Sequence, residues 1–128
     1  MLLVGCSDSD PAEQRGRLTV FESLPPHPPY VEGSLSFLRV VQLATKKVLV
    51  DGPRTDGTGV RGQDPLYSQP LPAGEYRLIS YQRPCAGNCK NLDPPADRCS
   101  SVVRLNAGEK LSVRVLLGQR GGCTIRRF

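Results

Sequence analysis

Aromatic and imidazole side chains are scarce in this 128-residue sequence, which has no Trp, three Phe, four Tyr and a single His. The histidine, His27, stands among prolines in residues 24–30, a segment that must be extended. A Ser-His-Asp triad needs an imidazole that a carboxylate orients on a rigid element, so His27 does not fit that role. No apolar run approaches the roughly 18 residues of a membrane-spanning helix. These absences argue against a histidine-based hydrolase and against a chain that spans the bilayer.

Glycine and proline are abundant, with 13 Gly and 12 Pro, while apolar residues make up 38% of the chain. This composition indicates many turns and short elements around one modest core. No window of about eleven residues has helical periodicity, and alternation of apolar with polar residues recurs instead. We therefore predict a single all-β domain rather than a helical bundle.

The alternation predicts a series of short strands. The clearest is residues 109–117, in which Leu111, Val113 and Val115 are expected to point inward. In residues 33–43 the pattern changes phase between Phe37 and Leu38, which indicates a bulge or a strand covered on both sides. Other strands are expected at residues 17–22, 46–50, 75–83, 101–105 and 122–127.

The chain is basic, with 17 Lys plus Arg against 12 acidic residues and a net charge of +5. Such a charge would attract anionic lipid headgroups, cell-wall polymers or nucleic acid. The arginines are scattered along the sequence, however, which favours solvated strand faces over a binding stripe; examples are Arg39, Arg54, Arg61, Arg77, Arg98 and Arg114.

The odd count of five cysteines leaves one thiol to explain, and it is Cys6. Leu3-Val4-Gly5-Cys6 resembles the bacterial lipobox, which implies cleavage just before Cys6 and a diacylglycerol thioether on its sulfur. A complete signal peptide has a basic start and an apolar run of about 7–15 residues. Only Met1 to Val4 of such a run is present, so we expect a longer precursor. The alternative is a chance match in a cytosolic protein.

Residues 7–17 contain one apolar side chain, Ala12, and are typical of a flexible tether. We therefore expect residues 1–5 to be the remnant of a signal peptide, residues 6–16 to be the lipidated Cys6 and its tether, and residues 17–128 to be one domain. The lipid would hold the protein at the outer, extracytoplasmic side of a cell membrane.

The other four cysteines, Cys85, Cys89, Cys99 and Cys123, form an even set, as an oxidising compartment predicts. A zinc site is the alternative, but gaps of three, nine and twenty-three residues do not match paired C-x2-C knuckles. Cys85 is expected to end one strand and Cys99 to begin the next, which would place them opposite each other. Of the three possible connectivities we therefore prefer Cys85–Cys99 with Cys89–Cys123.

Two segments share the pattern L-x-A-G-E, Leu71 to Glu75 and Leu105 to Glu109, each joining two predicted strands. Glycine supplies the positive φ that such a turn needs. With the Thr55-Asp56-Gly57-Thr58-Gly59 loop, these motifs resemble the prealbumin-like domains of the carboxypeptidase-regulatory and transthyretin-like group over residues 46–117. The resemblance implies a small Greek-key β-sandwich of about seven or eight strands, here with a disulfide-braced loop insert.

The sequence contains no candidate catalytic residue, cofactor site or metal ligand set. Asp51, Asp56 and Asp64 lack the spacing of a calcium loop, and Cys85-x3-Cys89 is not the C-x-x-C of thiol oxidoreductases. For nucleic acid, the nearest pairing of basic and stacking residues is Tyr81 with Arg83, together with the tail Arg126-Arg127-Phe128. We interpret these two groups instead as a strand edge and a chain terminus, which explain them more simply than a nucleic-acid site does.

The sequence favours a non-enzymatic envelope lipoprotein, expected to be monomeric, that binds an unknown envelope protein or a cell-wall polymer. Its candidate binding loop is the cysteine-braced insert with Asn88, Lys90, Asn91 and Leu92, because a preorganised loop on a rigid sandwich is a common binding element. The alternatives are a module that binds carbohydrate or another small ligand, and a cytosolic nucleic-acid-binding protein. Clustered, exposed tyrosines would favour the first alternative.

Overall fold

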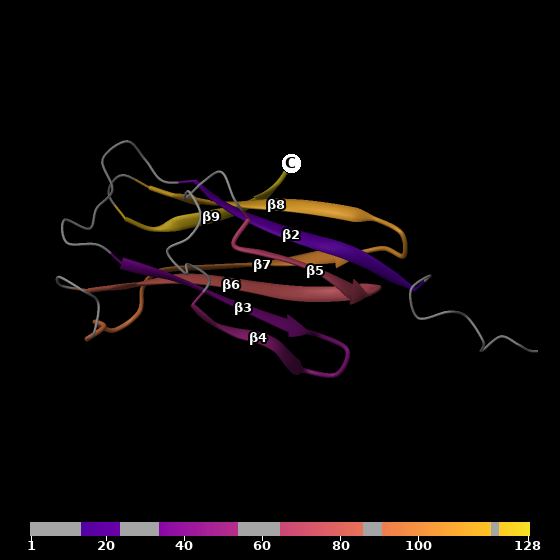
Figure 1. Ribbon diagram of the computed structural model, residues 1–128, viewed down its shortest axis with the longest axis horizontal. Helices are drawn as coiled ribbons and strands as arrows, with labels where there is room; N and C mark the ends of the chain where they lie inside the picture. Colours follow the sequence, from indigo (N-terminus) through magenta and orange to yellow (C-terminus); the bar gives the residue numbers. More distant parts are fainter. Residues whose placement is uncertain (1–13, 24–33, 54–64, 86–90, 119–120) are drawn as a thin grey trace, which may run out of the picture.

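The computed structural model describes residues 14–23, 34–53, 65–85, 91–118 and 121–128. These residues form eight β-strands in two four-stranded sheets that pack face to face (Figure 1). The strands are β2 (Arg15–Ser23), β3 (Ser34–Gln42), β4 (Lys47–Pro53), β5 (Tyr67–Pro72), β6 (Gly74–Pro84), β7 (Ala96–Leu105), β8 (Lys110–Leu117) and β9 (Cys123–Arg127). The prediction of an all-β sandwich is confirmed.

The first sheet has the strand order β5-β2-β8-β9. Strand β2 pairs antiparallel with β5 and parallel with β8, and β8 pairs antiparallel with β9. Strand β5 contains Pro70 and Pro72, which its place at the edge of the sheet permits because an edge strand leaves some N–H positions unpaired. These prolines interrupt the alternation, so the sequence pattern predicts no separate strand there.

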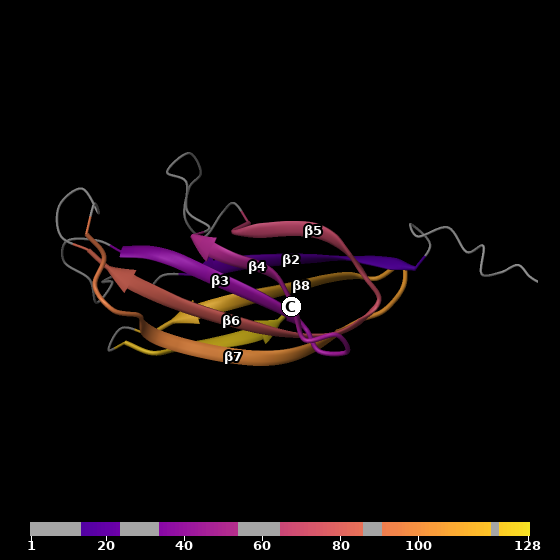
Figure 2. The same cartoon turned by 90° about the horizontal axis from the view of Figure 1, so that it is seen from below.

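The second sheet has the order β4-β3-β6-β7, and all of its neighbouring strands are antiparallel. Strand β3 has a β-bulge or irregularity against β4 at Val40/Val41. It lies beyond the predicted phase change at Phe37 and Leu38, where burial alternates without interruption. Strand β7 lies at the edge of this sheet on the same side of the sandwich as β9 of the first sheet, as Figure 2 shows from below.

The core lies between the sheets and is built from alternate positions of the strands. Leu111, Val113 and Val115 are buried on β8, as predicted. The side chains of Leu18 and Val20 on β2 meet those of Leu38 and Val40 on β3 and Tyr76 and Leu78 on β6 in the same cluster. Because the pattern has a period of two, the polar residues between them point outward from both sheets.

One end of the sandwich contains Gln14 and the turns β3–β4, β5–β6 and β7–β8. Because the expected tether would join the domain here, we call it the tether end. Here the Ala73 N–H donates to the Gln14 carbonyl, and the Gly108 N–H donates to the Arg15 carbonyl, each at 2.8 Å. The turn at residues 43–46 lies beside them, since the Leu43 N–H donates to the Glu75 carbonyl. Gly108 has a φ of 77°, as expected for the L-x-A-G-E turns.

None of the described residues belongs to a helix long and apolar enough to cross a membrane.

Candidate functional site

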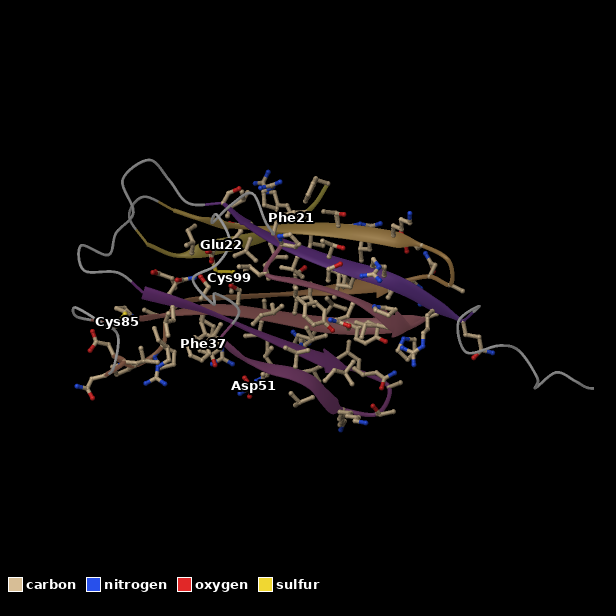
Figure 3. The ribbon with its side chains drawn as sticks, viewed as in Figure 1. Phe21, Glu22, Phe37, Asp51, Cys85 and Cys99 are labelled. Carbon is tan, nitrogen blue, oxygen red and sulfur yellow. A yellow bond between two sulfur atoms is a disulfide. The ribbon has the colours of Figure 1, made fainter. Side chains whose placement is uncertain are left out.

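The disulfide pairing preferred from the sequence is wrong. Cys99 on β7 is bonded to Cys123 on β9, with a Cα–Cα distance of 5.5 Å. Because β7 belongs to the second sheet and β9 to the first, this bond joins the two sheets along one edge of the sandwich. Figure 3 shows Cys99 between the two layers, whereas Cys85 lies apart from it near one end.

The register of β6 against β7 explains the error. Strand β7 begins at Ala96 rather than at the cysteine, so Cys99 lies opposite Ser80 in the middle of β6. Cys85 lies beyond the end of β6 and forms an isolated bridge with Leu92. Cys85 is itself disulfide-bonded, but Cys99 is not its partner. Cys89 and Cys6 lie outside the described residues.

The predicted binding loop is only partly described. Asn88 and Lys90 lie outside the described residues, Asn91 is exposed and Leu92 is half-buried. This second half of the insert is held against the end of β6 by Arg83. Its Nε donates to the Asp93 carbonyl at 2.9 Å, and its Nη2 donates to the Leu92 carbonyl at 3.2 Å.

The outer surface of the second sheet forms a basic and aromatic patch, which we call the arginine–aromatic face. Phe37 on β3 and Tyr81 on β6 are cross-strand neighbours, and their rings stack with centroids 5.1 Å apart. The guanidinium carbon of Arg83 lies 6.0 Å from the Phe37 ring centroid, and that of Arg98 lies 6.0 Å from the Tyr81 ring centroid. These rings are therefore already in contact with each other and with cations.

Further arginines belong to the same face because they alternate with buried residues. Arg77 on β6 and Arg104 on β7 are exposed neighbours of the buried Tyr76 and Leu105. Arg39 on β3 is paired with Asp51 on β4, with 3.0 Å between Nη2 and Oδ2. Val102, which pairs with Arg77, is 46% exposed. The face thus combines arginines with the exposed Val102 and the half-buried rings of Phe37 and Tyr81, and arginine and aromatic residues are enriched at the centres of protein interfaces.

A separate aromatic and cationic cluster lies on the outer surface of the first sheet. The guanidinium carbon of Arg114 on β8 is 5.3 Å from the ring centroid of Phe21 and 4.6 Å from that of Phe128. Arg114 also donates a hydrogen bond from Nη1 to the Ser23 hydroxyl at 2.9 Å. Because its partners come from within the fold, this cluster fixes the carboxyl-terminal residue on the sheet.

A buried polar cluster lies between the sheets. The Ser36 hydroxyl lies 2.9 Å and 2.7 Å from the two Glu22 carboxylate oxygens, and the Gln82 Nε2 donates to Glu22 Oε2 at 2.9 Å. All three residues have an exposed fraction of 0%. Figure 3 shows Glu22 directed into the space between the layers. The alternation of each strand indicates this placement, since Glu22 follows Leu18 and Val20 at intervals of two.

The edge of the sandwich opposite the disulfide is open. Here the edge strands β4 and β5 leave a groove of about 710 Å³, which reaches the buried side chains of Tyr67 and Leu71. Leu49 and Val50 line its other side, with Lys47 and Arg15 among the polar residues. The tyrosines of the described part do not gather on the surface, because Tyr67 and Tyr76 are buried and Tyr81 stacks on Phe37.

No family model, no curated protein and no solved structure matches the chain.

The described part of the chain offers few groups of side chains that could bind a metal ion or take part in proton transfer. Among those residues no three His, Cys, Asp or Glu side chains gather in a way that could hold a metal ion. Asp51 is paired with Arg39, while Asp56, Asp64 and His27 lie outside the described residues. Burial raises the pKa of the Tyr76 phenol above its ordinary value of 10.0, although the nearby Arg15 charge acts in the opposite direction. The Tyr76 hydroxyl donates a hydrogen bond to the Pro72 carbonyl.

The sequence pattern did not reveal the arginine–aromatic face. Arg39, Arg77 and Arg98 are distant in the sequence and were predicted to be scattered, but the strand order brings their strands together. Tyr81 and Arg83 lie on β6, a central strand of the second sheet, so the prediction that they mark a strand edge is wrong. Because Tyr81 and Arg83 alternate with Ser80 and Gln82, the sequence indicates that they point outward. It does not identify the strands that lie beside β6.

Proposed function

We propose that this protein is an exported lipoprotein of the cell envelope, anchored by a lipid on Cys6, whose sandwich binds an envelope protein or cell-wall polymer and catalyses no reaction. In this proposal the arginine–aromatic face, with the adjoining residues Asn91 and Leu92, is the contact surface. The domain is proposed to be related to the prealbumin-like group, which the two packed four-stranded sheets support.

The observation that carries the proposal is the Cys99–Cys123 disulfide between the sheets. Such bonds form and persist in oxidising compartments and are rare in the cytosol of most organisms. Cys85 is disulfide-bonded as well, which supports the expectation that Cys6 is the thiol left for acylation. Two clusters support a non-enzymatic role, because their side chains bind one another within the fold: Glu22 with Ser36 and Gln82, and Arg114 with the rings of Phe21 and Phe128.

A partner with acidic groups suits the proposed contact surface. Exposed Arg77, Arg98 and Arg104 can each offer two parallel N–H donors to a carboxylate or phosphate. Val102 and Tyr81 add apolar contact area between them. A planar base or sugar ring would have to compete with the existing stack of Tyr81 on Phe37, so the face suits a protein or polymer better than nucleic acid.

Mass spectrometry of the native protein tests the proposal. We expect a mature chain that begins at a diacylglyceryl-modified Cys6. Its mass should be about four hydrogens lower than that of the fully reduced chain, because each of two disulfides removes two hydrogens. A tryptic digest without reductant should contain the peptide of residues 99–104 linked to that of residues 121–126, because Arg98, Arg104, Arg120 and Arg126 are cleavage sites. An unprocessed chain with five free thiols would overturn the proposal.

A photo-crosslinking residue placed at Val102 tests the contact surface in intact envelopes. Val102 is 46% exposed on the arginine–aromatic face, so we expect a crosslinked partner at this position. The matched control is Thr124, which is exposed on β9 of the other sheet. Equal crosslinking from both positions, or none from Val102, would contradict the assignment.

The groove between β4 and β5 favours a second candidate, a module that binds a small ligand. Its volume of about 710 Å³ lies in the range of small-molecule sites, and its walls are partly apolar. Leu49→Trp would fill the groove. A ligand that raises the melting temperature of the native protein but not of this variant would favour the second candidate.

A further inference from the structure

The tether end carries a cluster of cations that nothing in the proposed contact surface uses. Arg15 and Lys47 line the groove between β4 and β5, while Arg15 and Arg17 line a second hollow together with Lys110. Lys46 follows in the turn between β3 and β4, and Lys46, Lys47, Arg17 and Lys110 are all exposed. We call this group the basic cluster; it consists of Arg15, Arg17, Lys46, Lys47 and Lys110.

The acidic residues at the same end do not compensate this charge. Glu109 accepts from Arg127, with 3.3 Å between Nη2 and Oε2, and also accepts from Asn106. Glu75 lies directly opposite Arg104 in the register of β6 and β7. Neither ion pair of the described residues, Arg39–Asp51 nor Arg127–Glu109, involves a member of the basic cluster. A field of one sign therefore projects from this end.

Lys46 places a cationic side chain at a backbone position that favours glycine. Its φ of 59° lies in the left-handed region, which only Gly, Asn and Asp adopt readily. The turn is supported instead by Thr45, whose hydroxyl accepts from the Lys47 N–H at 3.2 Å and donates to Gln42 Oε1 at 2.9 Å. A strained residue that presents a cation at the tip of a turn points to a function for that cation.

The path of the chain connects this end with the proposed anchor. Gln14 is fixed at the tether end by its hydrogen bond with Ala73. Eight peptide links separate Cys6 from Gln14, and a chain of that length spans at most about 29 Å even when fully extended. The eleven residues of β6 alone extend about 36 Å toward the opposite end. The anchor therefore keeps the end with the basic cluster within about 29 Å of its lipid, whereas the opposite end can lie farther from it.

We propose that the basic cluster docks the domain onto the anionic phospholipid headgroups of the membrane, so that the arginine–aromatic face stands roughly perpendicular to the bilayer and stays accessible. The orientation rests on the proposed lipid at Cys6, but the attraction of the cluster for headgroups does not. Each Lys or Arg near an anionic surface adds affinity, and the effect decays within a Debye length.

The test is sedimentation of the full, unacylated chain with vesicles of phosphatidylcholine and phosphatidylglycerol at a ratio of seven to three. We expect binding at about 10 mM salt that weakens strongly at about 150 mM, as the Debye length falls from roughly 30 Å to roughly 8 Å. Pure phosphatidylcholine vesicles should bind little. Lys46→Gln with Lys47→Gln should lower the partition coefficient about thirtyfold.

The matched control removes the same charge elsewhere. Arg98→Gln with Arg126→Gln leaves the basic cluster intact, and both residues are exposed. When the variants are compared at about 100 mM salt, where the Debye length is roughly 10 Å, this variant should lose less than about threefold. Equal losses in the two variants would mean that net charge alone drives binding and would overturn the proposal. Absence of binding by the unchanged chain would overturn it too.

A single substitution separates folding from binding. Lys46→Gly removes both the charge and the left-handed strain at φ 59°, so it should raise the urea midpoint while weakening vesicle binding about fivefold. Tighter or unchanged vesicle binding would contradict the proposal.

The alternative partner of the basic cluster is the chain's own acidic segment, which precedes the tether end in the sequence and contains Asp8, Asp10 and Glu13. Binding that occurs only after these three are changed to Asn, Asn and Gln would assign the cluster to the chain's own segment and overturn the lipid proposal. Because the vesicle assay uses unacylated protein, its outcome is independent of the mass of the native chain.

Discussion

Glu22 is the residue whose burial is most demanding for this fold, because a carboxylate removed from water must keep its hydrogen bonds. Ser36 lies within hydrogen-bond distance of both of its oxygens and Gln82 donates to one of them, so these two side chains replace part of the lost hydration. The cluster ties β2 of the first sheet to β3 and β6 of the second. It therefore couples the relative placement of the two sheets to polar geometry as well as to apolar packing.

Ser36→Ala should destabilise the protein by about 2 kcal/mol, because it removes a donor from the buried Glu22 carboxylate. Urea unfolding followed by circular dichroism measures this as a lower midpoint with an unchanged slope. Ser100→Ala is the matched control, since Ser100 is exposed on β7, and its effect should stay within about 0.5 kcal/mol. Similar losses in both variants would mean that the buried cluster adds no stability beyond strand propensity.

Tyr76 links the core to the edge strand through its hydrogen bond with the Pro72 carbonyl. Burial raises the pKa of its phenol in the folded state, so folding favours the protonated form. The resulting stability is fully present below pH 10 and is lost as the pH rises through the folded pKa. Tyr76→Phe should cost about 1 kcal/mol near neutral pH and should make the decline in urea midpoint above pH 10 shallower. A decline as steep as in the unchanged protein would contradict this.

At the scale of the element, local alternation predicted the direction of side chains but not the neighbours of each strand. The inward positions of β8 were predicted correctly, and the same rule applied to β2 would have placed Glu22 inside. The Cys85–Cys99 pairing failed because it assumed a register in which β7 starts at Cys99. The strand starts three residues earlier, at Ala96, and the partner of Cys99 comes from β9 in the other sheet.

The same limit applies to the arginine–aromatic face. Phe37, Tyr81 and Arg98 belong to β3, β6 and β7, and only the strand order makes them neighbours. Strand order depends on long-range packing of the whole chain, which a local pattern does not contain. The resemblance of Leu3 to Cys6 to a lipobox and the even set of later cysteines, by contrast, can be read without any strand order, and the predictions of compartment and anchor that rest on them stay predictions.

At the scale of the whole molecule, the two edges of the sandwich differ in kind. Along one edge β7 and β9 are joined by the Cys99–Cys123 bond, and along the other β4 and β5 are separated by the groove. The bond attaches β9, whose strand neighbour in the first sheet is β8, directly to the second sheet. Asp97 adds to this attachment, because its carboxylate accepts a hydrogen bond from the Gly122 N–H.

Cys99→Ala with Cys123→Ala should therefore lower the stability of the whole domain without changing its fold. The bond spans a sequence separation of 24, and closing a loop of that length in the unfolded chain corresponds to about 3.5 kcal/mol. Since domains of this size have a total stability of about 5–15 kcal/mol, the variant should fold and should melt about 10–15 °C lower. Differential scanning calorimetry measures the shift. Reductant should destabilise the unchanged protein at least as much, because it also opens the disulfide at Cys85. If the double variant melted at the same temperature as the unchanged protein, the bond between the sheets would contribute nothing to stability. The packing of Val103, Leu105 and Ile125 would then suffice to hold that edge of the sandwich together.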